Sequence, residues 1–93
     1  MISADNILHH ELIGLESLVS ASLNPNTKGI KGVVIDETKN TLIIEQNKAR
    51  KRIIKQDSVF IFKLPDETMV EIDGSALIGR PEDRMKKRIK RRW

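Results

Sequence analysis

Alternation of apolar and polar residues with a period of two dominates residues 15–79 and predicts short β-strands. The clearest example is GIKGVVIDETKNTLIIEQ, in which two β-branched runs flank DETKN, a segment rich in turn-forming residues. This segment predicts a β-hairpin, with residues 33–35 in one strand and residues 42–44 in the other.

Further strands are predicted on both sides of this hairpin, each ending at a turn signal. They are LESLVSASL (15–23), RKRIIKQ (50–56), SVFIFKL (58–64), MVEID (69–73) and, as a short last strand, SALIG (75–79). Six or seven short strands favour a small antiparallel β-barrel or a tightly curled sheet, because closure hides strand edges. The fold class is therefore mainly β, with residues 15–79 as the barrel.

Two short helices are predicted to flank the strands, over residues 3–13 and 81–92. Ser3 suits the N-cap of the first helix, and Pro81 suits the first turn of the second. Each helix has one narrow apolar stripe, made by Ile7, Leu8 and Leu12 in the first and by Met85, Ile89 and Trp93 in the second. A helix this short is marginal in water, so the second helix must dock on its own barrel, on the first helix or on a partner protein. We expect both stripes to contact a protein partner.

Positive charge is concentrated in two places within what is expected to be a single domain spanning residues 1–93. The net charge is +4, but residues 80–93 hold eight Lys and Arg against two Asp and Glu, whereas residues 1–79 hold nine against eleven. The second concentration is KARKRIIK, residues 48–55. Two basic clusters on a small domain favour a polyanionic partner such as nucleic acid, although such clusters also serve solubility.

The predicted RNA contacts are ten cations from these two clusters. They are Lys48, Arg50, Lys51, Arg52, Lys55, Arg80, Arg84, Lys87, Arg88 and Arg91. The chain has three aromatic residues, of which Phe60 and Phe62 lie in its most apolar segment and are expected in the core. Because base stacking needs exposed aromatic side chains, recognition of the RNA backbone by Lys and Arg is the favoured mode.

Catalytic and metal-binding groups do not converge in the sequence. His9 and His10 are adjacent on a predicted helix and point about 100° apart, so they cannot chelate one metal together. The acidic pairs at residues 36–37 and 66–67 fall in predicted turns, where carboxylates bond the backbone. Cysteine is absent, which excludes disulfides and thiolate zinc sites. We therefore expect no catalytic residue, metal site or cofactor in this chain.

Four segments resemble the archaeal ribonuclease P protein component 1 family, whose eukaryotic relatives belong to ribonuclease P and MRP. They are HELIGL near the start, GIKGVVIDETKNTLIIE in the hairpin, VFIFKLP, and EIDGSALIGRPEDR towards the end. The resemblance covers nearly the whole chain. It implies an Sm-like β-barrel with helical extensions in the ribonucleoprotein that removes 5′ leaders from precursor tRNA.

The resemblance also implies a set of partners. The chain would be a non-catalytic subunit that stabilises the fold of the RNA subunit, which supplies catalysis with Mg²⁺. It would pair with a second, zinc-binding protein subunit and meet precursor tRNA only indirectly. We expect a cytoplasmic protein without a membrane segment that is a monomer when isolated.

Two other functions remain open from the sequence. A free-standing Sm-like RNA chaperone or ribosome-associated RNA-binding protein would share the barrel and the basic clusters. Such chaperones form rings through exposed edge strands, so a stable hexamer or heptamer would favour that alternative. A structural module without nucleic acid would show no salt-sensitive RNA binding.

Overall fold

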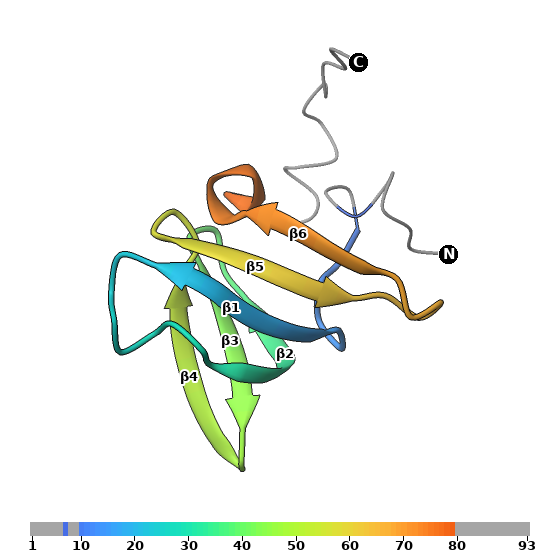
Figure 1. Cartoon of the computed structure of the whole chain (residues 1–93), viewed down its shortest axis with the longest axis horizontal. Helices are drawn as coiled ribbons and strands as arrows, with labels where there is room; N and C mark the ends of the chain where they lie inside the picture. The colour runs from blue at the N-terminus through green and yellow to red at the C-terminus, as the bar shows by residue number, and fades with distance from the viewer. Residues whose placement is uncertain (1–6, 8–9, 80–93) are drawn as a thin grey trace.

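A six-stranded antiparallel sheet forms the body of the computed structural model, which describes residue 7 and residues 10–79 (Figure 1). The strands are β1 (Glu16–Ser22), β2 (Lys31–Glu37), β3 (Thr41–Gln46), β4 (Ala49–Ile54), β5 (Ser58–Lys63) and β6 (Met69–Asp73), followed by the 3₁₀-helix η2 (Gly74–Leu77). Their order in the sheet is β4-β3-β2-β1-β5-β6, so β4 and β6 are the two edges.

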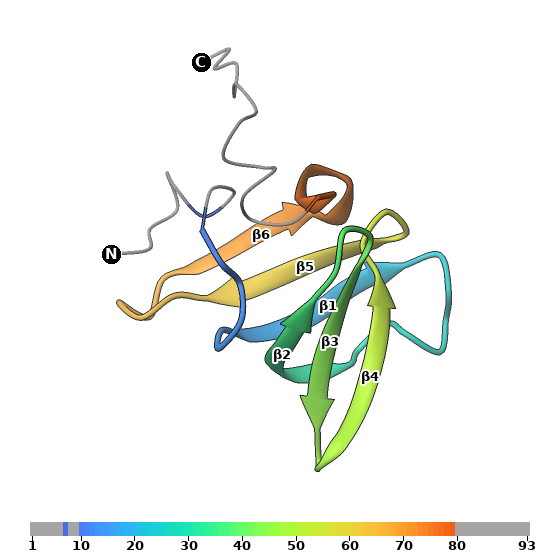
Figure 2. The same cartoon turned by 180° about the vertical axis from the view of Figure 1, so that it is seen from behind.

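The sheet curls on itself. Figures 1 and 2 show that β5 and β6 run across the direction of β3 and β4, with β1 joining the two halves. Strand β1 pairs with β5 from Glu16 to Ser22, with one register shift, but with β2 only over Glu16, Ser17 and Leu18. This confirms the predicted mainly β fold with six strands.

The hydrophobic core fills the inside of the curl. Its buried members are Ile7, Leu12, Leu15, Val19, Val34, Leu42, Ile44, Ile53, Phe60, Phe62, Leu64 and Leu77. Phe60 and Phe62 stack with ring centroids 5.8 Å apart, which confirms the prediction that both are core residues. Burial of these side chains supplies the main driving force for folding.

The segment SALIG does not form the predicted last strand. Residues Gly74–Leu77 instead form η2, and the side chain of Asp73 accepts a hydrogen bond from the backbone N–H of Ser75 at 3.0 Å, as an N-cap does. A Cβ atom at Gly74 would clash with the carbonyl oxygens of Lys55 and Ser58. Glycine therefore lets η2 pack directly against the β4–β5 turn.

The helix predicted for residues 3–13 does not extend through residues 10–13, which form a bend, a coil and the start of a turn. Ile7 has 3₁₀ conformation, and its carbonyl accepts a hydrogen bond from the N–H of His10 at 3.1 Å. Gly14, with a φ of 97°, then turns the chain into β1. Residues 3–6 and 8–9, and the helix predicted for residues 81–92, lie outside the described residues.

Candidate nucleic-acid interface

Strand β4 exposes a row of cations at one edge of the sheet. Lys48, Arg50, Lys51 and Arg52 are all exposed, as predicted from the basic cluster. Asn47 and Lys48 form the two-residue turn between β3 and β4, with φ angles of 51° and 68°. This left-handed geometry is typical of tight hairpins. The turn sets the register that places Arg50 and Arg52, two residues apart, on the outer face of the sheet.

A β-bulge in β2 determines which acidic residues share that outer face. The register of β2 against β3 shifts between Val34 and Asp36, so Ile35 is the extra residue. Before the bulge Val34 faces the core, and after it the Glu37 side chain faces inward. Ile35 and Asp36 therefore both line the outer surface.

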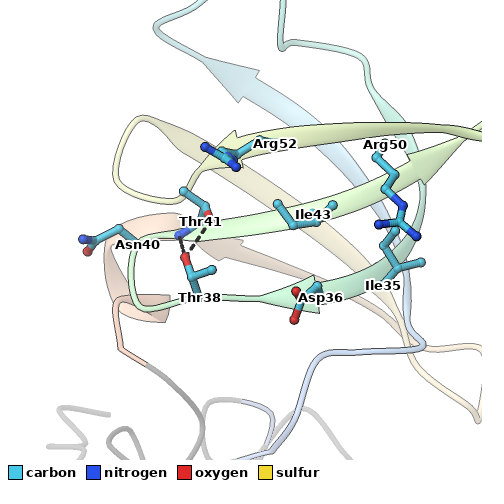
Figure 3. Close-up of a pocket in the computed structure, with 8 residues that line it drawn as sticks. All are labelled: Ile35, Asp36, Thr38, Asn40, Thr41, Ile43, Arg50 and Arg52. Carbon is cyan, nitrogen blue, oxygen red and sulfur yellow. Dashed lines mark hydrogen bonds between the residues drawn. The ribbon is translucent and has the colours of Figure 1, made fainter.

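A shallow groove of about 720 Å³ lies on the outer face of β2, β3 and β4. Figure 3 shows its lining residues, which are Ile35, Asp36, Thr38, Asn40, Thr41, Ile43, Arg50 and Arg52. Arg50 and Arg52 stand on the β4 side, whereas Asp36, Thr38 and Asn40 stand on the β2 side, with Ile43 between them. The groove is therefore basic along one wall, polar along the other and apolar in the middle.

Asp36, Ile43 and Arg52 form one transverse row across three strands, because Asp36 pairs with Ile43 and Ile43 pairs with Arg52. Two strand spacings separate the backbones of Asp36 and Arg52, roughly 10 Å. Within residues 7 and 10–79, neither Arg50 nor Arg52 makes an ion pair or a side-chain hydrogen bond. Both guanidinium groups are thus available to a ligand.

One end of the groove is held in shape by two threonines. The hydroxyl oxygens of Thr38 and Thr41 lie 2.6 Å apart, and Thr38 Oγ1 also accepts the backbone N–H of Thr41 at 3.1 Å. These bonds close the β2–β3 turn (Figure 3). Asn40, in the same turn, is exposed beside them.

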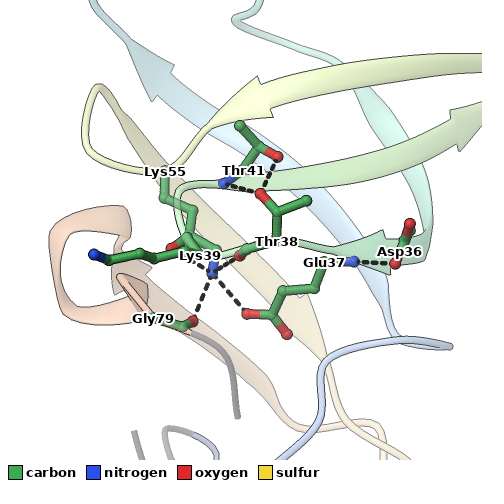
Figure 4. Close-up of polar contacts among 7 residues, drawn as sticks. All are labelled: Asp36, Glu37, Thr38, Lys39, Thr41, Lys55 and Gly79. Atoms are coloured by element: carbon green, nitrogen blue, oxygen red, sulfur yellow. Dashed lines mark hydrogen bonds and ion pairs between the residues drawn. The ribbon is translucent and has the colours of Figure 1, made fainter. Parts of the chain in front are cut away.

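Lys55 was predicted to bind RNA, and the structure contradicts this. Its Nζ is completely buried and donates to Glu37 Oε2 at 2.8 Å and to the carbonyl oxygens of Thr38, Gly79 and Lys39 at 2.8, 2.9 and 3.3 Å (Figure 4). Alternation along β4 continues into the following turn and directs this side chain inward, opposite to Arg52. The lysine joins the β2–β3 turn to the end of the described chain and is unavailable to a phosphate.

Two residues of the predicted protein-partner stripes are also corrected. Ile7 and Leu12 are 2% and 0% exposed and belong to the hydrophobic core, so they have no surface to offer a partner. Apolar residues near a small barrel serve first to complete its core. The other predicted site residues lie outside the described ranges: Leu8, Arg80, Arg84, Met85, Lys87, Arg88, Ile89, Arg91 and Trp93.

The sequence did not single out the polar wall of the groove. Asp36 was interpreted as a turn residue, but it belongs to β2. Only the bulge brings it beside Ile35 on the outer face, and alternation alone gives no sign of an inserted residue. Thr38 and Asn40 were visible merely as turn-forming residues.

Residue 7 and residues 10–79 contain no group of three or more His, Asp or Glu side chains able to hold a metal ion. Over the same residues no helix has the length and apolar character needed to cross a membrane.

Comparison with known proteins identifies the family. The family model described as ribonuclease P/MRP, subunit p29, matches residues 5–87. The chain belongs to this family. Ribonuclease P protein component 1 of Methanocaldococcus jannaschii is 50% identical over 91 residues, covering 97% of this chain and 95% of the relative. The same component of Methanothermobacter thermautotrophicus is 46% identical over 92 residues, covering 98% and 99%.

A solved structure with a similar fold supports the same family assignment. The structure of Mth11, a homologue of human RNase P protein Rpp29, superimposes with a TM-score of 0.61 at 45% identity, covering 80% of this chain and 96% of that one. The resemblance noted in the sequence and the Sm-like barrel are both confirmed. This p29-family protein is a protein subunit of ribonuclease P, an endoribonuclease of tRNA processing, and the comparisons do not favour a free-standing chaperone.

Proposed function

We propose that this p29-family subunit binds the RNA of ribonuclease P through the outer face of β2, β3 and β4, and thereby stabilises the RNA fold. The observation that carries the proposal is a pair of guanidinium groups, Arg50 and Arg52, that line one wall of an open groove and have no ion-pair partner among residues 7 and 10–79. Exposed Lys48, in the turn before β4, adds a cation beside them, whereas Lys51 is exposed on the other face of this edge strand. Guanidinium groups bind phosphates in a bidentate manner, which suits backbone recognition.

The structure supports contact with the RNA backbone rather than stacking on aromatic residues. Phe60 and Phe62 are fully buried, so neither offers a platform for a base. Each exposed cation that meets a phosphate releases condensed counterions and makes binding salt-dependent. The groove and the basic edge therefore act together as an electrostatic contact with folded RNA.

The chain does not carry the catalytic groups of the enzyme in this proposal, and Mg²⁺ acts at the RNA subunit. What supports this is how the acidic side chains are used. Asp36, Asp66 and Asp73 each accept a hydrogen bond from a nearby backbone N–H, at 2.8, 2.9 and 3.0 Å. Glu37 pairs with Lys55. Cleavage of precursor tRNA by the purified chain, free of RNA, would contradict this assignment.

The protein partner in this proposal is the zinc-binding subunit, which the family resemblance suggests. With Ile7 and Leu12 in the core, the contact falls to the remaining stripe residues, Leu8, Met85, Ile89 and Trp93. Replacing Ile89 and Trp93 by alanine is expected to weaken the protein pair by at least about 2 kcal/mol, because buried anchors of this size dominate interfaces. Calorimetry on the two purified subunits measures the change.

The groove is tested with the double variant Arg50→Gln and Arg52→Gln bound to the RNA subunit over a range of salt concentrations. Loss of two phosphate contacts is expected to reduce the slope of log K against log salt by about 1.5, at roughly 0.7 to 0.9 per contact. The matched control replaces Lys28 and Lys63, two cations outside the groove, by glutamine. An equal reduction in both double variants would contradict a site at the groove.

A further inference from the structure

We infer that the groove binds one unpaired nucleotide of the RNA, holding its base as well as its phosphate, and prefers a base with an amino group. The inference rests on the proposed function, because it assumes that Arg50 and Arg52 bind RNA. It adds a base-reading element to a surface that would otherwise recognise only the backbone.

The observation behind it is a carboxylate inside a groove proposed to bind phosphates. Asp36 is exposed, lines the groove and makes no ion pair with the described residues. A carboxylate repels phosphate, so a surface that bound backbone alone would gain nothing from it. The bulge at Ile35 nevertheless places it there, on the same face as Arg52.

The dimensions of the groove suit a single nucleotide. Arg52 and Asp36 stand at opposite ends of one transverse row, roughly 10 Å apart at the backbone, with the half-buried side chain of Ile43 between them. Ile35 widens this apolar floor (Figure 3). A nucleotide with its phosphate at Arg52 would lay its base over Ile43 and bring the far edge of the base to Asp36.

The chemistry of Asp36 selects the base. Its Oδ1 accepts the backbone N–H of Glu37 at 2.8 Å, which fixes the carboxylate and leaves Oδ2 directed to other donors. An ionised carboxylate only accepts hydrogen bonds, so it pairs with an amino group such as N4 of cytosine. Uracil presents a carbonyl oxygen at the same position of the same ring, and two acceptors repel each other. Cytosine and uracil are therefore a matched pair of ligands.

The experiment measures binding of single-stranded oligocytidine and oligouridine of about ten nucleotides, a length suited to a single-strand site. At near-neutral pH the wild-type protein is expected to bind oligocytidine about tenfold more tightly, the effect of one base-edge contact. Asp36→Asn should bring the ratio close to one, because the amide both donates and accepts. The control is Asp66→Asn, which removes an equal charge from an exposed carboxylate that also accepts a nearby backbone N–H, at a site outside the groove.

The outcomes separate this inference from the proposed function. Equal binding of the two oligonucleotides by the wild-type protein, or an unchanged ratio in Asp36→Asn, would overturn the inference even if Arg50→Gln and Arg52→Gln still weakened binding to the RNA subunit. If those arginine variants bound the RNA subunit as the wild-type protein does, the groove itself would fail as the RNA site. The wild-type ratio needs no variant, so the test does not depend on the folding of Asp36→Asn.

Discussion

The outer and inner faces of β2, β3 and β4 use their acidic and basic side chains in opposite ways. On the inner face Glu37 and Lys55 are in contact at 2.8 Å, with side chains 2% and 0% exposed. On the outer face Asp36 and Arg52 stand apart across Ile43 and form no ion pair. Neighbouring residues of a strand face opposite sides, so the bulge at Ile35 determines that Glu37 points inward and Asp36 outward.

The contrast follows from solvation. A buried ammonium group must have its charge and its three hydrogens satisfied, and Lys55 meets this need with Glu37 and three backbone carbonyls. An exposed ion pair contributes at most about 1 kcal/mol, so leaving Arg52 unpaired costs the fold little. The buried Lys55–Glu37 pair therefore affects the stability of the fold, whereas Arg52 can bind a ligand at little cost to stability.

The largest expected effect comes from breaking the inner pair. Lys55→Met removes the ammonium group, so the buried Glu37 carboxylate loses its ion pair and three backbone carbonyl oxygens lose the hydrogen bond from Lys55. We expect a loss of about 3 to 5 kcal/mol in the free energy of unfolding, the range found when one partner of a buried pair is removed. Denaturant unfolding followed by circular dichroism measures it. Arg52→Met, on the exposed outer face of β4, is the control and should change stability by less than about 0.5 kcal/mol. Similar losses in the two variants would erase the distinction between the faces.

A second comparison uses two isoleucines that are neighbours on β3. Ile44 is 0% exposed and faces the core, whereas Ile43 is half-buried on the groove face. Ile44→Ala is expected to lower the free energy of unfolding by about 2 to 4 kcal/mol, because it leaves a cavity. Ile43→Ala should lower the free energy of unfolding by under about 1 kcal/mol, because less apolar surface of this side chain is buried on folding. The same unfolding experiment decides, and an equal loss for both would mean that the groove face is packed like the core.

The smallest expected effect concerns Asp66, which lies in the turn between β5 and β6 rather than on a face of the sheet. A hydrogen bond from the backbone N–H of Thr68, with a further one from its hydroxyl, holds the pKa of Asp66 below its ordinary value of 3.8. Because this pKa is lower in the folded state, the ionised group stabilises the fold above the ordinary value, and that stabilisation is lost as pH falls through the lowered pKa. The stability difference between wild type and Asp66→Asn should therefore shrink as pH falls below 3.8. A difference that stays constant across this range would show that the carboxylate charge has no part in the turn.

The hairpin of β2 and β3 and the exposed cations of β4 were predictable, because alternation and turn chemistry are local properties of the sequence. The inward direction of Lys55 was not predictable, because nothing in the surrounding run of cations indicates that this lysine pairs with the buried carboxylate of Glu37. The 3₁₀-helix η2 was missed for a similar reason. Its apolar residues fit a strand equally well, and only the close approach of Gly74 to the β4–β5 turn requires the helix.

Some residues of the candidate site were likewise predictable from the sequence, and others were not. Arg50 and Arg52 could be found from charge and spacing, but Asp36 was misplaced because a bulge shifts the phase of a strand without changing its composition. Ile7 and Leu12 were assigned to a partner because their apolar spacing suits a helix. Whether such a stripe meets a partner or the chain's own core depends on how much core the barrel still lacks, which is a property of the whole fold.

The hydrogen bonds of Lys55 also hold Gly79, the residue after which the basic segment 80–93 begins. Both backbone polar groups of Gly79 are hydrogen-bonded. Its N–H donates to the Lys39 carbonyl at 2.7 Å, and its carbonyl accepts from Lys55 Nζ at 2.9 Å. The fourteen residues that follow, with eight Lys and Arg, are therefore tethered at a fixed point next to the β2–β3 turn that bounds the groove. In the proposed complex, RNA bound in the groove would meet those cations at a high effective concentration, so that two modest contacts combine into a much stronger one. Loosening this joint would lower affinity for RNA without removing any of the charges that touch it.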